Sequence, residues 1–152
     1  INRLLHDKNF YIYGDGKQRR AFSHIDDVAP AMVKAGFEKK CEGKIINLGS
    51  NVSVTLNELA KIVLEEFFDH GKIPAKFLPE KLLARPQEVK YAFCSHKVAK
   101  KLIGFQDKMP LRPGIKNMIS WASSLGPQPF VYLESMDLEH DSAPTTWKTK
   151  LI

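Results

Sequence analysis

The sequence contains few of the features that mark disulfide-bonded, membrane-spanning or metal-binding proteins. Its two cysteines, Cys41 and Cys94, lie far apart and show no metal-ligand spacing, which favours reduced thiols over a disulfide framework. Its apolar runs are far shorter than the roughly 18–20 residues that span a bilayer, and no signal-peptide pattern opens the sequence. No Ser/His/Asp or Cys/His set, internal repeat or low-complexity tract is readable. We therefore expect a cytoplasmic protein without a metal site.

The composition fits an ordinary globular domain with a basic surface. Of its 152 residues, 43% are hydrophobic and 26% are charged, which is enough to bury a core. The net charge of +6 fits a nucleic acid, an anionic small molecule or no charged partner at all. Because no recognised nucleic-acid-binding module occurs in the sequence, nucleic acid is the least favoured of these partners.

Hydrophobic periodicity and turn residues predict a small α/β domain of short strands and three to four helices. The best-specified helix begins at Thr55, because Thr55 and Glu58 form a capping box ahead of an apolar stripe. Asp26 or Asp27 is expected to cap an earlier helix that continues to Lys39. The other expected elements are helices over 1–7, 95–103 and 110–121, and strands or extended segments over 10–13, 19–25, 44–48 and 89–93.

A Gly-Asp-Gly turn followed by two adjacent arginines is the first candidate for ligand chemistry. Gly14 and Gly16 supply the positive φ of a tight reversal, and Arg20 follows on an extended segment. A guanidinium group presents paired donors that fit a phosphate. If the fold brings Arg20 and Arg85 together, the two could hold a diphosphate from opposite sides. From spacing alone, solvated or ion-paired surface arginines are the more frequent explanation of such a pattern.

Four stretches of the sequence, in order, resemble the motifs of one enzyme family. They are "IYGDGKQRRAFSHIDDVAPAM", "IINLGSNVSVTLNELAKIV", "RPQEVKYAFCSHKVAKKLIGF" and "MPLRPGIKNMISW". They are similar to motifs of the extended short-chain dehydrogenases, the NAD-dependent nucleotide-sugar epimerases and dehydratases related to UDP-glucose 4-epimerase. The resemblance covers residues 1–123 and points to the C-terminal, substrate-binding part of such an enzyme. Residues 124–152 are then expected to form a C-terminal tail or arm.

The resemblance implies roles for five residues. Arg20 falls on a family arginine that contacts the nucleotide diphosphate, and Arg85 falls on a second diphosphate ligand. Glu88 occupies the place of the acidic residue that hydrogen-bonds the nucleotide ribose. Tyr11 and Ile12 lie where the family's short strand packs near the base.

The sequence departs from the family pattern next to these positions. Ala21 stands where an Asp is usual after Arg20, and Gln87-Glu88 replaces Gly-Asp. The resemblance also places Asn47 near the expected nucleotide-sugar site. The Glu88 side chain is one methylene longer than the usual Asp, whereas both arginines, Arg20 and Arg85, are retained.

The family also has two features that this sequence does not contain. Such enzymes hold the NAD pyrophosphate at a Gly-x-x-Gly-x-x-Gly turn that opens a helix, and they carry a Tyr and a Lys four positions apart on a helix. The sequence has no such glycine turn, and its Tyr13–Lys17 match straddles Gly-Asp-Gly, which will not sit in a helix. We therefore assign no catalytic and no cofactor-binding residue, and expect NAD only in the full-length enzyme. The expected protein partner is a Rossmann half, absent here, or a second copy of the chain.

Three interpretations follow from the sequence. The first is the nucleotide-sugar-binding portion of an NAD-dependent sugar epimerase or dehydratase, whose ligand is a nucleotide diphosphate sugar and which is inactive alone. The second is a noncatalytic nucleotide-sugar-binding or interaction module that lacks its own cofactor half. The third is a basic nucleic-acid-binding module, for which steep salt dependence and indifference to loss of both arginines would be diagnostic.

Overall fold

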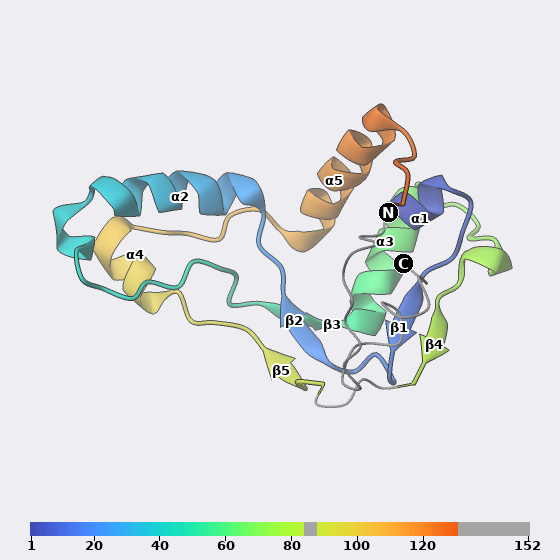
Figure 1. Cartoon of the computed structure of the whole chain (residues 1–152), viewed down its shortest axis with the longest axis horizontal. Coiled ribbons are helices and arrows are strands. Elements are labelled where there is room, and N and C mark those ends of the chain that lie inside the picture. Colours follow the sequence, from blue (N-terminus) through green and yellow to red (C-terminus); the bar gives the residue numbers. More distant parts are fainter. Residues whose placement is uncertain (84–87, 131–152) are drawn as a thin grey trace, which may run out of the picture.

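The chain folds into five α-helices and five short strands in a computed structural model that describes residues 1–83 and 88–130 (Figure 1). The helices are α1 (Asn2–Leu5), α2 (Ile25–Phe37), α3 (Leu56–Phe67), α4 (Lys97–Ile103) and α5 (Leu111–Leu125). The strands are β1 (Tyr11–Tyr13), β2 (Arg19–Ala21), β3 (Ser53–Thr55), β4 (Glu80–Leu82) and β5 (Tyr91–Ala92). The expected mixed α/β class is confirmed, with five helices in place of three to four.

The strands form two small sheets. β1 and β4 pair in parallel, with Tyr11 opposite Glu80. In the other sheet β2 lies between β3 and β5, antiparallel to β3 and parallel to β5. The register places Arg20 opposite Val54 on β3 and Ala92 on β5. Arg20 therefore sits on a central strand whose backbone is fixed from both sides.

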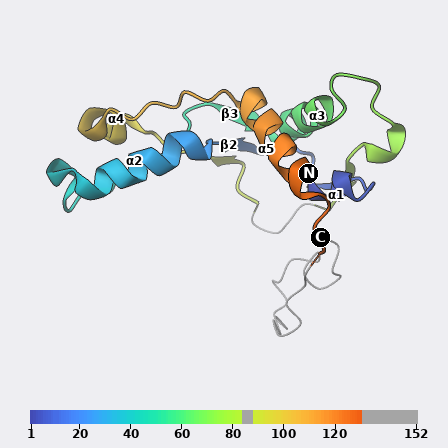
Figure 2. The ribbon, with the colours of Figure 1, turned by 90° about the horizontal axis from the view of Figure 1, so that it is seen from above.

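The molecule is elongated, and its helices gather at two ends. α2 and α4 lie at one end, whereas α1, α3 and α5 lie at the other with β1 and β4 (Figure 1, Figure 2). The sheet formed by β3, β2 and β5 lies between these ends. The Arg20 strand thus connects two separately packed helical regions.

The end that contains α3 has a core of large apolar side chains. Leu4, Leu64 and Phe77 are buried together, and these partly buried side chains pack around them: Phe10, Val63, Phe67, Phe68 and Ile73. The helix starts where the sequence predicts. The Thr55 hydroxyl accepts a hydrogen bond from the Glu58 N–H at 3.1 Å, and the Glu58 carboxylate accepts one from the Thr55 N–H at 2.7 Å. This capping box satisfies backbone donors that the first turn of a helix leaves unpaired.

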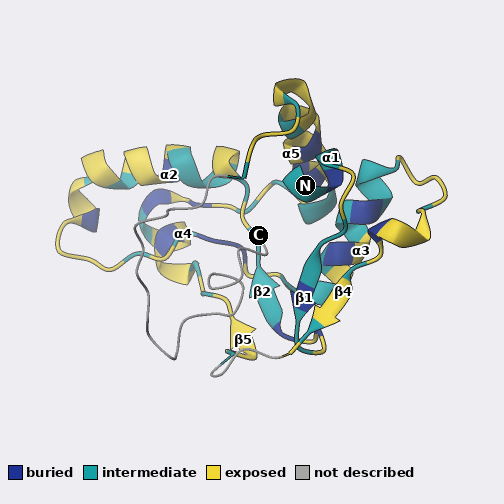
Figure 3. Ribbon diagram, turned by 45° about the vertical axis from the view of Figure 1, so that its right-hand side comes forward, coloured by how far each residue is buried: buried dark blue, intermediate teal, exposed yellow. Residues whose placement is uncertain are grey.

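The end that contains α2 and α4 has a smaller core and an open outer surface. Ala31, Cys41, Ala99, Ile103 and Phe105 form its buried cluster. Much of α2 is exposed, as the yellow segments of its ribbon show (Figure 3). The exposed side chains include large apolar ones: Ile25, Met32, Val33 and Phe37 on α2, and Ile45 beyond it. This end therefore exposes a group of large apolar side chains, and the other end exposes Met118, Trp121 and Leu125 on α5.

Two local predictions are wrong. The cap of α2 is His24 rather than Asp26 or Asp27, because the His24 Nδ1 accepts a hydrogen bond from the Asp26 N–H at 3.3 Å. Residues 44–48 are not a strand, and Ile45 is 92% exposed. An apolar β-branched run becomes a strand only beside another strand, and none of the described strands pairs with this one.

Other boundaries shift by a few residues. Helix α4 follows His96 rather than Ser95, and it ends as expected at Gly104, whose φ of 70° suits glycine. Helix α5 continues past Trp121 to Leu125. Among the helices of the described residues, none combines the length and the apolar character that a membrane span requires.

Candidate functional site

Arg20 and Glu88 meet, although 68 positions separate them in the sequence. The Arg20 Nη2 donates to the Glu88 Oε1 at 2.5 Å, and each side chain is 26% exposed. The Arg20 Nη1 donates to the Arg19 carbonyl oxygen at 2.8 Å, which orients the guanidinium. Two residues expected at the diphosphate and the ribose of one ligand therefore lie side by side in a partly sheltered position.

The parallel pairing of β2 and β5 creates this meeting. The Arg19 N–H donates to the Lys90 carbonyl oxygen at 2.8 Å, which ties the segment that carries Glu88 to the start of β2. Because this tie lies one residue from Arg20 and two from Glu88, the distance between the two side chains depends little on distant parts of the chain. No single stretch of sequence contains this information.

The two adjacent arginines have different surroundings. Successive side chains of a strand point to opposite faces, so Arg19 and Arg20 diverge. The Arg19 guanidinium donates to the Ser53 hydroxyl at 3.1 Å and to the Ser53 carbonyl oxygen at 2.5 Å. Arg19 thus joins β2 to β3, and Arg20 is the arginine whose partner is another expected ligand-binding side chain.

The remaining expected residues are placed as follows. Arg85 lies outside the described residues, so its place beside Arg20 stays a prediction. Ile12 is buried at 4% exposure on β1, where its side chain contributes to packing. The half-buried Tyr11 has the Arg3 guanidinium over its ring, 4.8 Å from the centroid. Asn47 is exposed on the segment that leads to Gly49.

The glycine turn is filled by a side chain. Gly16 has a φ of 73°, and a Cβ placed on it would lie 2.2 Å from the Asn57 Oδ1. The Asn57 amide donates to the Asp15 carbonyl oxygen at 2.9 Å, so the turn receives the first residues of α3. Tyr13 lies on β1 and Lys17 follows the turn, so the two do not share a helix. The Tyr-x-x-x-Lys match is therefore a coincidence of spacing in the sequence.

A pocket that the sequence did not predict lies on the side of the sheet that carries Arg20. It has a volume of about 260 Å³ and is lined by Phe22, Ser50, Val52, Val54 and residues 107–111. Residues directly opposite in a sheet share a face, so Val54 places the pocket on the side of the sheet that carries Arg20. Asp27 holds the outer wall, since its carboxylate accepts hydrogen bonds from the Lys108 and Met109 N–H groups at 3.0 and 2.8 Å. An Asp in the first turn of a helix gives no sequence signal for such a long-range contact.

His96 fixes the loop that contains Ser50. Its Nδ1 lies 2.7 Å from the Gly49 carbonyl oxygen, which can only accept, so Nδ1 carries the proton and donates. In the neutral ring the Nε2 then accepts from the Asn51 amide at 3.0 Å. His96 therefore has a structural role in positioning residues 49–51.

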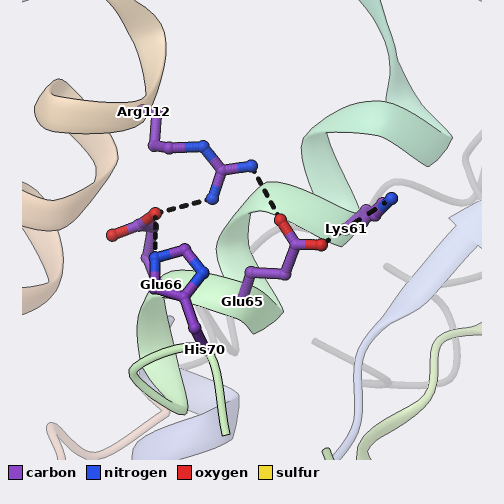
Figure 4. A network of polar contacts seen from close by, with 5 residues as sticks. All are labelled: Lys61, Glu65, Glu66, His70 and Arg112. Carbon is purple, nitrogen blue, oxygen red and sulfur yellow. Dashed lines mark hydrogen bonds and ion pairs between the residues drawn. The ribbon is translucent and has the colours of Figure 1, made fainter.

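Arg112 joins α5 to α3 through two carboxylates (Figure 4). It donates to Glu65 and to Glu66, each at 2.7 Å, and the Glu66 side chain is only 5% exposed. The hydrogen bond from Arg112 lowers the pKa of the Glu65 carboxyl, and the two carboxylates raise the pKa of Arg112. Lys61 and His70 flank the cluster at 3.7 Å from Glu65 and 3.3 Å from Glu66. This network holds the helix whose first residue lines the pocket.

The described residues offer no cluster of three or more His, Cys, Asp or Glu side chains that could hold a metal ion. The Asn57 side chain packs against Gly16 of the glycine turn. The site brings together an arginine donor and a carboxylate acceptor, with a largely apolar pocket on the same side of the sheet.

Comparison with known proteins finds relatives that match most of the chain. Residues 1–49 match the model of the NAD dependent epimerase/dehydratase family. UDP-glucuronate 4-epimerase of Thermodesulfobacterium geofontis is 30% identical over 123 residues, which are 80% of this chain and 36% of that protein. Mouse dTDP-D-glucose 4,6-dehydratase is 28% identical over 123 residues, covering 80% of this chain and 34% of that protein.

Solved structures give the same family. A mutant of UDP-glucuronic acid 4-epimerase from Bacillus cereus, in complex with UDP-4-deoxy-4-fluoro-glucuronic acid and NAD, superposes with a TM-score of 0.70 at 26% identity. The superposition covers 82% of this chain and 38% of that one. The chain belongs to the NAD-dependent epimerase/dehydratase family, the extended short-chain dehydrogenases. It spans about a third of the length of the curated relatives it matches.

Proposed function

We propose that this chain is the nucleotide-sugar-binding portion of an NAD-dependent sugar epimerase or dehydratase. The observation that carries the proposal is the contact between Arg20 and Glu88 at 2.5 Å. In the family, the matching arginine contacts the ligand's diphosphate and the matching acid contacts its ribose. A nucleotide diphosphate sugar carries these two groups next to each other, so one ligand can engage both side chains.

The role of this portion is to position the substrate. Arg20 donates N–H groups to diphosphate oxygens, Glu88 accepts hydrogen bonds from ribose hydroxyls, and Arg85 is expected to hold the diphosphate from the other side. Binding energy gained at the remote nucleotide places the sugar ring for a reaction at another part of the enzyme. The groups of this chain take no covalent part in that reaction.

The NAD of the parent enzyme requires a Rossmann half, which this sequence does not contain. We propose that this half covers the apolar side chains exposed at the α2 end, among them Phe37 at 90% and Ile45 at 92% exposure. Large apolar side chains that are exposed in this way favour association with another protein surface. Without such a cover, the chain is expected to self-associate at high concentration.

Calorimetric titration of the chain with UDP-glucose tests the proposal. Arg20→Gln is expected to weaken binding by at least about tenfold, because a sheltered charged hydrogen bond contributes roughly 1.5–3 kcal/mol. The matched control is Lys17→Gln, which removes the same charge from a side chain that is 81% exposed. If Arg20→Gln stays within twofold of the wild type, the diphosphate role of Arg20 is wrong.

A salt series on the same samples separates the nucleic-acid interpretation. A nucleic-acid-binding module would bind an oligonucleotide with steep salt dependence, and its affinity would be unaffected by Arg20→Gln beyond the effect of Lys17→Gln. The proposed function predicts the reverse, with sugar-nucleotide affinity concentrated at Arg20.

A further inference from the structure

Glu88 is the side chain that engages the Arg20 guanidinium in this structure. Its carboxylate accepts the Arg20 Nη2–H at 2.5 Å, which is the geometry of an anionic ligand oxygen. We propose that Glu88 makes the Arg20 site selective, so that the site excludes small inorganic phosphates and admits ligands in which a ribose diol adjoins the diphosphate. This inference rests on the proposed function and adds to it a selectivity role for Glu88.

The excluded ligands are those that bring only negative charge. Pyrophosphate that approaches the Arg20 Nη2 must either displace Glu88 or lie beside it. Displacement removes a charge-assisted hydrogen bond from a partly buried carboxylate, and coexistence places like charges in contact. Because pyrophosphate keeps at most about one hydroxyl proton at neutral pH and is otherwise an acceptor, it offers Glu88 fewer donors than a ribose diol does.

A nucleotide offers the exchange that pyrophosphate lacks. An ionised carboxylate only accepts hydrogen bonds, and its two oxygens have room for several donors. The two hydroxyls of a ribose supply such donors, while the diphosphate accepts the N–H groups that Glu88 releases. Recognition sites discriminate most strongly when the wrong ligand leaves a buried polar group without a partner.

The positions of both side chains are fixed before the ligand arrives. Arg20 lies on the central strand of its sheet and also donates to the Arg19 carbonyl oxygen at 2.8 Å. The 2.8 Å hydrogen bond from the Arg19 N–H to the Lys90 carbonyl oxygen holds the segment that carries Glu88. The pair therefore competes with a ligand as a preorganised contact, and its removal should change affinity rather than fold.

Titration with inorganic pyrophosphate and with UDP-glucose tests the inference on four proteins: the wild type, Glu88→Gln, Glu42→Gln and the double variant Arg20→Gln/Glu88→Gln. Glu88→Gln keeps the side-chain shape and removes the charge. It should tighten pyrophosphate binding by at least about tenfold, a change of about 1.4 kcal/mol, and leave UDP-glucose binding equal or weaker. Glu42 is exposed, so Glu42→Gln controls for the identical change in net charge.

The gain for pyrophosphate must disappear in the double variant, because it depends on Arg20. Glu88→Ala provides a second route to the same result if the Gln amide forms its own bond with Arg20. The inference is overturned if pyrophosphate affinity in both Glu88 variants stays within twofold of the wild type, or if Glu42→Gln produces the same gain. Failure of the wild type to bind UDP-glucose would instead contradict the proposed function.

Discussion

The two helical ends of the molecule bury apolar side chains to different extents. The α3 end surrounds Leu64 with Leu4, Phe77 and several aromatic neighbours, caps its helix and ties α5 down through Arg112. The α2 end buries a cluster of smaller side chains and leaves Phe37 and Ile45 in water. The difference teaches that the α3 end has the core of larger side chains, although Met118, Trp121 and Leu125 on α5 are also more than half exposed, and we propose that a further surface covers the α2 end. The Arg20–Glu88 pair lies on the sheet between them.

The largest difference should come from truncating one apolar side chain at each end. Leu64→Ala removes a side chain that is 3% exposed and should lower the free energy of unfolding by about 2–5 kcal/mol. Ile45→Ala, at the other end, should change it by no more than about 0.5 kcal/mol, because Ile45 is 92% exposed. Urea denaturation of both variants measures the contrast. Equal losses would mean that the two ends are not packed differently.

Replacement of two glycines by alanine, one at each end of the molecule, should change the stability in opposite directions. Gly16→Ala should destabilise by about 1–2 kcal/mol from its positive φ alone, and the contact with Asn57 adds to this. Gly36→Ala, on α2, has nothing within 4 Å of the new Cβ and should stabilise by about 0.5–1 kcal/mol. Thermal denaturation should therefore move the two midpoints in opposite directions. A stabilising Gly16→Ala would refute the close packing of the turn on α3.

Loss of the capping box at Thr55 should have a smaller effect on the free energy of unfolding. Thr55→Ala removes the hydroxyl that accepts the Glu58 N–H at 3.1 Å and should lower the free energy of unfolding by about 1 kcal/mol. Thr55→Ser keeps an acceptor at the same place and is the control. Urea denaturation compares them. A loss as large in Thr55→Ser as in Thr55→Ala would assign the effect to the methyl group instead of the cap.

The Arg112 network should show itself in the pH dependence of stability. Arg112 lowers the pKa of Glu65 below its ordinary value of 4.5, so the folded state releases this proton more readily than the unfolded state. The resulting stabilisation is complete above pH 4.5 and is lost as the pH falls through the lowered pKa.

Arg112→Met should therefore lower the thermal midpoint at neutral pH, and its difference from the wild type should shrink in acid. Lys61→Met is the control, because Lys61 is 74% exposed and 3.7 Å from Glu65, where an ion pair contributes little. A difference between Arg112→Met and the wild type that persists unchanged in acid would show that packing, rather than charge, joins α5 to α3.

Features that depend on neighbouring residues and features that depend on distant residues differ in how well the sequence predicts them. The start of α3 is encoded locally, since Thr55 and Glu58 satisfy each other within one turn. The end of α4 is equally local, because Gly104 adopts the left-handed conformation that stops a helix. The capping box of α3 and the stop at Gly104 were therefore predicted correctly, although the equally local cap of α2 was not, because the His24 ring takes the role expected of Asp26 or Asp27.

Features that depend on residues distant in the sequence were not predicted. Residues 44–48 have the composition of a strand, but strand formation depends on a neighbour that the described residues do not provide. The pocket wall depends on Asp27 reaching Lys108, 81 positions away. Arg20 was predicted as a ligand-binding residue from the arginine pair after the glycine turn and from the family motifs, and Glu88 from the motifs, whereas their direct contact depends on the pairing of β2 with β5.

The most direct test of the account is to map where a sugar nucleotide binds. Backbone and arginine side-chain NMR spectra of the labelled chain should be recorded during titration with UDP-glucose, and repeated with Arg20→Gln. The account predicts that chemical shifts change at Arg20, Glu88 and their neighbours on β2 and β5, and that these changes vanish in the variant. Changes confined to α2 and α4, or changes that persist without Arg20, would contradict it.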